Sequence, residues 1–292
     1  MNNTVSSKFQ LIASMFTFGT IGLFVEYIPL PSGSIAFVRG TVGALCLLIF
    51  AFCSKTEISL KAIKANLLLL LLSGSAIGFN WIFLFEAYRH TTIATATLCY
   101  YMAPVFVMLA SPLVIKEKLT AKKLVCVVGA LIGMVFVSGV IGDEIPEVGE
   151  LLGIVFGLVA AALYAAVILL NKKLGEISAH NRTVVQLAFA AAVVLPYTLL
   201  AEEISSFAFT PICIVLLLCV GVVHTGVAYL LYFGSMKGLS AGTVAILSYI
   251  DPVVAIILSS VILKQPMGIS SVIGAALILA SALISELPQR NK

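Results

Sequence analysis

Charge is scarce in this sequence, and its scarcity excludes a water-soluble fold. Charged residues make up 10% of the 292 residues and apolar residues 61%, and the mean hydropathy is +1.15. A soluble domain carries about 25% charged residues, because its exterior has to face water. The excess of apolar side chains therefore has to face lipid, and the sequence predicts an integral membrane protein.

Motifs of enzyme chemistry are also missing. P-loop, HExxH and Rossmann signatures do not occur in the sequence. The cysteines lie in or beside apolar stretches without a CxxC pair, which favours buried packing over a metal or redox site. One histidine and one aspartate within the apolar stretches are thin support for an intramembrane enzyme. We therefore expect no enzymatic activity, no cofactor and no metal. The six cysteines are Cys46, Cys53, Cys99, Cys126, Cys213 and Cys219.

Apolar stretches of about 20 residues, the length that crosses a bilayer as a helix, recur along the chain. They lack the alternation of an outer-membrane barrel strand, and helices are the other way to satisfy backbone groups in lipid. The sequence predicts an all-α bundle of ten spans. These are Gln10–Leu30, Ser34–Cys53, Ala65–Tyr88, Ile93–Ile115, Leu124–Ile141, Leu151–Leu170, Thr183–Ala201, Pro211–Met236, Leu239–Leu263 and Ser270–Ser285.

The basic residues indicate the orientation of these spans. With ten helices and a cytoplasmic N-terminus, Arg89 and Lys264 fall outside and Arg39 falls within a helix. All other lysines and arginines then lie on the cytoplasmic side, as the positive-inside rule requires. We expect both termini in the cytoplasm and a multi-pass protein of a bacterial-type inner membrane, with lipid as its surroundings. The net charge of +4 reflects this topology and indicates no nucleic-acid partner.

The second half of the chain repeats the first. A shift of 148 residues aligns 89–133 with 237–281 without a gap. Each half, 1–142 and 143–292, holds five predicted spans, and a second copy of an odd unit enters the membrane from the opposite side. Inverted repeats are typical of secondary transporters, in which the two halves exchange conformations around one site. Aligned identities include Thr95 with Thr243, Tyr101 with Tyr249 and Pro104 with Pro252.

The layout resembles a known family. Arg39 in AFVRGTVGALCLL and the paired segments YYMAPVFVMLASPLVIKEKLT and SYIDPVVAIILSSVILKQPMG are similar to the EamA-type drug/metabolite transporters. The resemblance covers nearly the whole chain and implies a ten-helix carrier that exports amino acids, other metabolites or drugs, with or without protons. Two positions depart from the family pattern. Phe18 stands where a Trp-Gly pair is frequent, and Gln265-Pro266 stands where Glu-Pro or Glu-Arg is common.

Polar residues within the spans are candidates for the transport site, because burying them in lipid is costly. Asp251 falls near the middle of its span, and the next residue, Pro252, frees the carbonyl group of Ser248. Asp251 can alternate between proton and substrate, or can tie helices together. His224 can carry a proton beside Asp251, or can hydrogen-bond between helices. Pro104 and Pro252 are candidate hinges.

A charged pair flanks the first outer hairpin. Glu26 and Arg39 can form an ion pair, or can bind the amine and the carboxylate of a zwitterion. Glu86 lies near the outer end of the third span, where we expect solvation or pairing close to Arg89.

Aromatic and amide side chains complete the candidate site. The rings can stack on an apolar or cationic substrate, or can serve as interfacial anchors and core packing. The amides can bind substrate or bridge helices. The aromatic candidates are Trp81, Tyr100, Tyr101, Tyr164, Tyr229, Tyr232 and Tyr249, and the amide candidates are Asn80 and Gln186.

The sequence favours a transporter that exports a small metabolite, first an amino acid or related compound, by alternating access, with protons as a candidate coupling ion. Multidrug efflux of organic cations is the alternative, with Asp251 facing the cation. A channel or scramblase is the second alternative, but it needs no acid at the membrane midplane. Direction, coupling and oligomeric state stay open.

Overall fold

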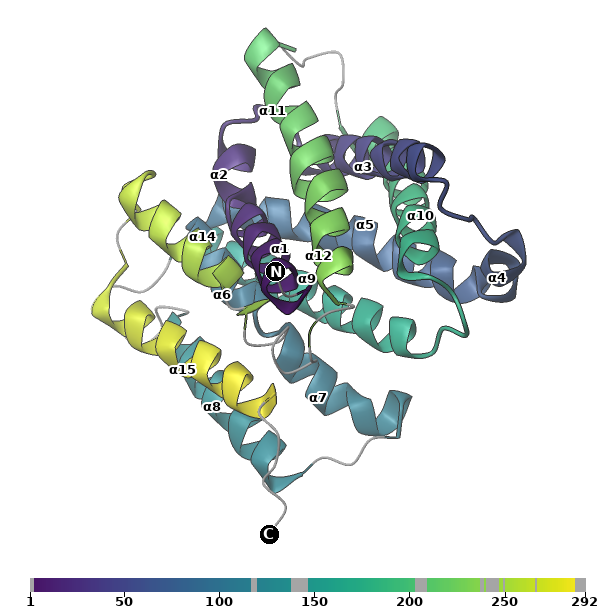
Figure 1. Ribbon diagram of the computed structural model, residues 1–292. Coiled ribbons are helices and arrows are strands. Elements are labelled where there is room, and N and C mark those ends of the chain that lie inside the picture. Colours follow the sequence, from purple (N-terminus) through teal and green to yellow (C-terminus); the bar gives the residue numbers. More distant parts are fainter. Residues whose placement is uncertain are drawn as a thin grey trace.

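The computed structural model describes residues 3–116, 120–137, 147–202, 209–236, 239, 247–248, 250–265 and 267–286. Within these ranges every regular element is helical (Figure 1), which confirms the predicted all-α class. The elements are α1 (Asn3–Gly19), α2 (Ile21–Glu26), α3 (Ser32–Ser54), α4 (Leu60–Ala65), α5 (Leu67–His90), α6 (Ile93–Tyr100), α7 (Ala103–Val114), α8 (Ala121–Val137), α9 (Val148–Lys172), α10 (Ala179–Ala201), α11 (Pro211–Gly221), the π-helical turn η2 (Val222–Val227), α12 (Ala228–Met236), α14 (Ile250–Val261) and α15 (Ile269–Glu286).

Seven helical segments of the described chain have the length and apolar composition of membrane spans. The helices α8, α14 and α15 are shorter and overlap the fifth, ninth and tenth predicted spans. The count of ten spans therefore stays a prediction. The seven segments are Val5–Glu26, Ser32–Ser54, Leu67–His90, Ile93–Val114, Val148–Lys173, Ala179–Leu200 and Pro211–Tyr232.

Three of these seven segments are interrupted near their middle or end. The first breaks at Thr20, between α1 and α2. The fourth breaks between α6 and α7, and Pro104 occupies the first turn of α7, where its missing N–H group is tolerated. The seventh contains the π-helical turn Val222–Val227 between α11 and α12. Residues beside the first two interruptions line the site described below, and the third contacts that site through the bond between Thr225 and Arg39.

The helices pack as a bundle with one pair set to the side. The long helix α5 packs against α9 and α10, and α10 packs against α3. In Figure 1 the pair α8 and α15 lies along one edge of the bundle. Gly133 and Gly274 make their close approach possible, because a Cβ atom on Gly133 would lie 2.8 Å from the carbonyl oxygen of Gly274.

Candidate functional site

A cavity of about 420 Å³ lies among the helices. Its size falls in the range of about 300–1,000 Å³ that is typical of small-molecule sites. The residues that line it come from α1, α2, α3, α5, α6, α7, α9, α10, α12 and α14, with Tyr101 from the break between α6 and α7 and Ser248 from the residues before α14. On α9 and α10 the lining residues lie toward the turn that joins these two helices. The cavity therefore extends toward that end of the bundle.

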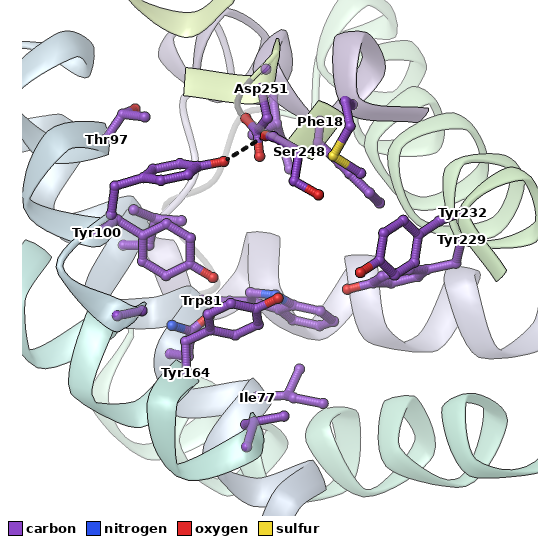
Figure 2. Close-up of a pocket in the computed structure, with 18 of the residues that line it drawn as sticks. Phe18, Ile77, Trp81, Thr97, Tyr100, Tyr164, Tyr229, Tyr232, Ser248 and Asp251 are labelled. Atoms are coloured by element: carbon purple, nitrogen blue, oxygen red, sulfur yellow. Dashed lines mark hydrogen bonds between the residues drawn. The ribbon is translucent and has the colours of Figure 1, made fainter. Parts of the chain in front are cut away.

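Aromatic rings form much of the cavity wall. Tyr100 packs against Tyr164 with ring centroids 5.4 Å apart, and Phe18 packs against Tyr229 at 5.4 Å and Tyr232 at 6.3 Å. Figure 2 shows Tyr164, Tyr229 and Tyr232 with their hydroxyl groups turned toward the same space, above the ring of Trp81. This wall can contact an apolar or cationic group and donate hydrogen bonds to a polar one.

Asp251 lines the cavity from the first turn of α14 and is half-buried. The hydroxyl group of Tyr101, which comes from the break after α6, lies close to its carboxylate. The same hydroxyl lies 3.4 Å from the carbonyl oxygen of Ser248, the acceptor that Pro252 was expected to free. Each half of the chain thus contributes to this polar corner.

Arg39 reaches the cavity from α3 and is 6% exposed. Its Nε atom donates a hydrogen bond to Thr225 Oγ1 at 3.0 Å. Its guanidinium carbon lies 4.4 Å from the ring centroid of Trp81 and 5.9 Å from that of Phe85. Both contacts favour a fixed, planar orientation of the cation.

The two predicted amides bridge helices while they line the cavity. Gln186 Nε2 donates to Ser73 Oγ and to Asn171 Oδ1, each at 2.6 Å, and Asn80 Nδ2 donates to the carbonyl oxygen of Ala160 at 2.6 Å. Their hydrogen bonds link α5, α9 and α10 and so fix the shape of this wall.

Arg182 is a cavity residue that sequence reasoning missed. It was assigned to a cytoplasmic loop, among the charges that set the topology. It lies four residues before Gln186 on α10, and residues at this spacing share a helix face. That spacing is the signal that could have found it.

His224 is buried on the π-helical turn outside the cavity, where it makes the interhelical hydrogen bond that was one of its two predicted roles and does not contact Asp251. Its Nε2 atom lies 2.9 Å from Thr20 Oγ1, and its Nδ1 atom lies 3.3 Å from the carbonyl oxygen of Cys219. Its ring also packs against Phe24, with centroids 4.7 Å apart. Equal depth in the membrane does not place two side chains together, because each helix also has a rotation about its axis.

Glu26 and Arg39 do not form the ion pair that was considered. Glu26 ends α2 and is exposed, while Arg39 is buried against Trp81 and Thr225. Of the two candidate hinges, Pro104 lines the cavity. Pro252 follows the lining residue Asp251 but is not itself a lining residue. Tyr249 lies outside the described residues.

Glu86 pairs with His90, one turn further along α5, with 3.8 Å between Oε2 and Nε2. The expected neighbour Arg89 instead donates a hydrogen bond to the carbonyl oxygen of Leu30. Glu86 therefore belongs to the end of the bundle and not to the cavity.

Two side chains tie together the end of the bundle at which α3 and α6 begin. The carboxylate of Glu202 accepts hydrogen bonds from the backbone N–H groups of Gly33 at 2.8 Å and Ser34 at 3.0 Å, and from Ser34 Oγ at 2.6 Å. Gln265 Oε1 accepts a bond from the backbone N–H group of Ile93 at 3.1 Å. Both acceptor residues belong to the second half of the chain, and all three donor residues belong to the first.

Comparisons with known proteins agree with this architecture. The model of the EamA-like transporter family matches residues 6–139 and 151–287. The transporter YxxF of Bacillus subtilis (strain 168) is 30% identical over 295 residues, which cover 97% of this chain and 90% of that protein. A transporter of Archaeoglobus fulgidus is 28% identical, with 94% of each chain covered.

A solved crystal structure shares the fold with a TM-score of 0.66 and 17% identity, over 97% of both chains. The relatives carry the name of transporters, and the two matched segments together span most of the sequence. Several apolar helices around an amphiphilic cavity fit such a multi-pass membrane protein. The chain therefore belongs to the EamA-like transporter family.

Proposed function

We propose that this transporter exports a small metabolite that carries both an amine and a carboxylate, such as an amino acid or a related compound. The observation that carries the proposal is the pair Asp251 and Arg39, which line one cavity with opposite charges. Both residues lie in the described chain, and no ion pair within 4 Å joins them. A buried charge gains from an opposite charge beside it, and a zwitterion would place one beside Asp251 and one beside Arg39.

The aromatic wall supports an amino acid over a purely cationic drug. The rings of Trp81, Tyr164 and Tyr229 can hold an apolar side chain. A monovalent cation could also meet these rings and Asp251, but the guanidinium group of Arg39 would repel it. Organic-cation efflux therefore enters the test as the competing outcome.

Alternating access accounts for the asymmetry between the two ends of the bundle. The end tied by Glu202 and Gln265 is closed in this proposal, while the cavity extends toward the opposite end. We place the tied end outside, with ten spans, cytoplasmic termini, and inverted repeats at 1–142 and 143–292 in an inner membrane. A channel would need both ends open together, and its flux would not saturate.

Protons are the proposed coupling ion, and Asp251 is the proposed carrier. One proton that moves inward through 100 mV contributes about 2.3 kcal/mol, which supports nearly two decades of substrate gradient. A carboxylate that binds either a proton or the substrate amine exchanges one for the other across the membrane.

The test is uptake by liposomes that contain the purified full chain, with and without an inward-directed proton gradient. A panel of amino acids and organic cations is compared for wild type and Asp251→Asn. We expect saturable, gradient-stimulated transport of an amino acid, and loss of the stimulation in the variant. Glu176→Gln is the matched control, because Glu176 is an exposed carboxylate outside the cavity.

Each alternative gives a different result. Transport of organic cations alone would replace the amino-acid proposal with drug efflux. Flux that rises linearly with concentration would indicate a channel. Amino-acid transport with unchanged gradient stimulation in Asp251→Asn would reject Asp251 as the proton carrier.

A further inference from the structure

The π-helical turn Val222–Val227 joins α11 to α12 and contacts Arg39 through Thr225. π-helical turns are rare, occur mostly as single turns within α-helices, and cluster at functional sites. Thr225 lies on this turn, is 0% exposed and does not line the cavity. Its hydroxyl group donates to the carbonyl oxygen of Val220, five residues earlier, at 3.0 Å. This i−5 partner reflects the wider turn.

The hydrogen-bond roles at Thr225 follow from the number of available hydrogens. Its hydroxyl group has one hydrogen, which goes to Val220, so Oγ1 is left to accept. Arg39 Nε can only donate, and it does so at 3.0 Å. The contact between Thr225 and Arg39 is therefore a directed, charge-assisted bond in a buried position.

A close helix approach makes this bond possible. Gly43 lies one turn after Arg39 on α3, and a Cβ atom there would collide with the Cγ2 atom of Thr225. Gly226, the next residue on the π-helical turn, meets Cys46 of α3 in the same way. Without side chains at these two glycines, the π-helical turn and α3 touch directly.

Two contacts then fix the guanidinium group from two directions. Thr225 accepts a hydrogen bond from Nε. The Trp81 ring lies against the guanidinium group, and the distance from the guanidinium carbon to the ring centroid is 4.4 Å. Arg39 also lines the cavity, and among the described residues its hydrogen bond to protein is made by Nε, so its two terminal nitrogen atoms can form the binding edge. Two parallel N–H donors are the arrangement that a carboxylate binds in a bidentate manner.

We propose that Thr225 is a positioning residue that orients Arg39 as a carboxylate subsite of the cavity. The inference rests on the proposed function, in which Arg39 receives the carboxylate of the substrate. It adds that selectivity for a carboxylate over an uncharged group depends on a hydroxyl group that the substrate does not touch.

The chain supplies its own reporter for the test. Trp81 is the single tryptophan of the sequence and carries the stacked guanidinium group, so its emission depends on where Arg39 lies. The full chain in lipid nanodiscs is titrated with L-phenylalanine and, separately, with L-phenylalaninamide, which lacks the carboxylate. Tryptophan emission is recorded before and during each titration.

The variants separate the hydroxyl group from its volume. Thr225→Val keeps the volume and removes the oxygen, Thr225→Ser keeps the oxygen, and Thr225→Ala is a second hydroxyl-free variant without branched bulk. Thr198→Val is the matched control, because Thr198 is buried in α10 and its hydroxyl group bonds the carbonyl oxygen of Val194 within its own helix.

We expect Thr225→Val to shift the ligand-free emission and to weaken L-phenylalanine binding roughly tenfold, the size of one hydrogen bond to a charged group. Binding of the amide should stay unchanged, and Thr225→Ser and Thr198→Val should resemble wild type. The inference would be overturned if wild type and both hydroxyl-free variants had equal ligand-free emission and an equal ratio of affinities for L-phenylalanine and its amide.

The two proposals can fail separately. If wild type binds neither probe, the amino-acid proposal loses its support, while the ligand-free emission still tests whether Thr225 orients Arg39. A serine-rescued emission shift supports the positioning role in that case, and no shift overturns it.

Discussion

The bond between Glu202 and the start of α3 gives a quantitative prediction about access to the cavity. Replacing Glu202 by Gln keeps one acceptor oxygen. The second carboxylate oxygen becomes an NH2 group, a donor that would face a backbone N–H group. The variant loses the bond from Gly33 and the favourable interaction of an anion with a helix N-terminus. Because Glu202 is half-buried, we take the low end of the range, about 2 kcal/mol in all. The closed state should lose roughly 30-fold in population relative to the open one.

Labelling of a cysteine in the cavity measures that population. Thr97 lines the cavity from α6, is 3% exposed, and lies about 6 Å along the helix from the tied end. Thr97→Cys is labelled with a membrane-impermeant maleimide in intact cells and in inverted vesicles. The chain without this cysteine gives the background from the six native ones.

We expect the change at Glu202 to accelerate labelling about 30-fold in cells, because the tied end is proposed to face outward. Glu150→Gln, which changes an exposed carboxylate in the first turn of α9, should leave the rate unchanged. Faster labelling only in inverted vesicles would reverse the proposed orientation. If the change at Glu202 left the labelling rate unaltered in both cells and inverted vesicles, the idea that Glu202 holds this end closed would be refuted.

Two further predictions concern the same helices. The side chain of Gln265 caps the N-terminus of α6 at Ile93, and a negative charge there would strengthen the cap. Gln265→Glu should therefore slow the labelling of Thr97→Cys two- to fivefold, and Gln265→Ala should speed it. Equal labelling rates for the two variants would contradict this role. Gly19→Ala should lower the melting temperature by several degrees, because its Cβ atom would lie 2.5 Å from the carbonyl oxygen of Asp251, and overpacking of this kind costs about 1–3 kcal/mol. Gly149→Ala, where no atom lies within 4 Å, should melt like wild type, and an equal loss at both glycines would argue against the clash.

Several site residues could be predicted because lipid makes buried polarity conspicuous. Asp251, Arg39 and Asn80 stand out in apolar stretches, and all three line the cavity. The tyrosines of the spans were predicted on weaker grounds, since aromatic residues also anchor membrane interfaces. Tyr101 was correctly associated with the proline breaks, and its bond to Ser248 joins the two halves.

Other assignments depended on helix rotation, which the sequence leaves open. His224 has the depth of a site residue but faces Thr20 and Phe24. Arg182 reads as a loop charge because it lies near a helix end, yet its face of α10 is turned inward. Glu26 ends α2 and stays exposed, whereas Arg39 is buried.

By itself, the sequence determined the solvent and the class of this protein. Its lack of charge requires lipid, and lipid requires helices, because every backbone group must be satisfied within the segment. Only the tertiary structure decided that Thr225 stands behind Arg39, and that Glu202 and Gln265 of one half cap helices of the other. These contacts join residues more than 160 positions apart, and they depend on the rotation and close approach of helices, which are set by packing at glycines such as Gly43 and not by hydropathy.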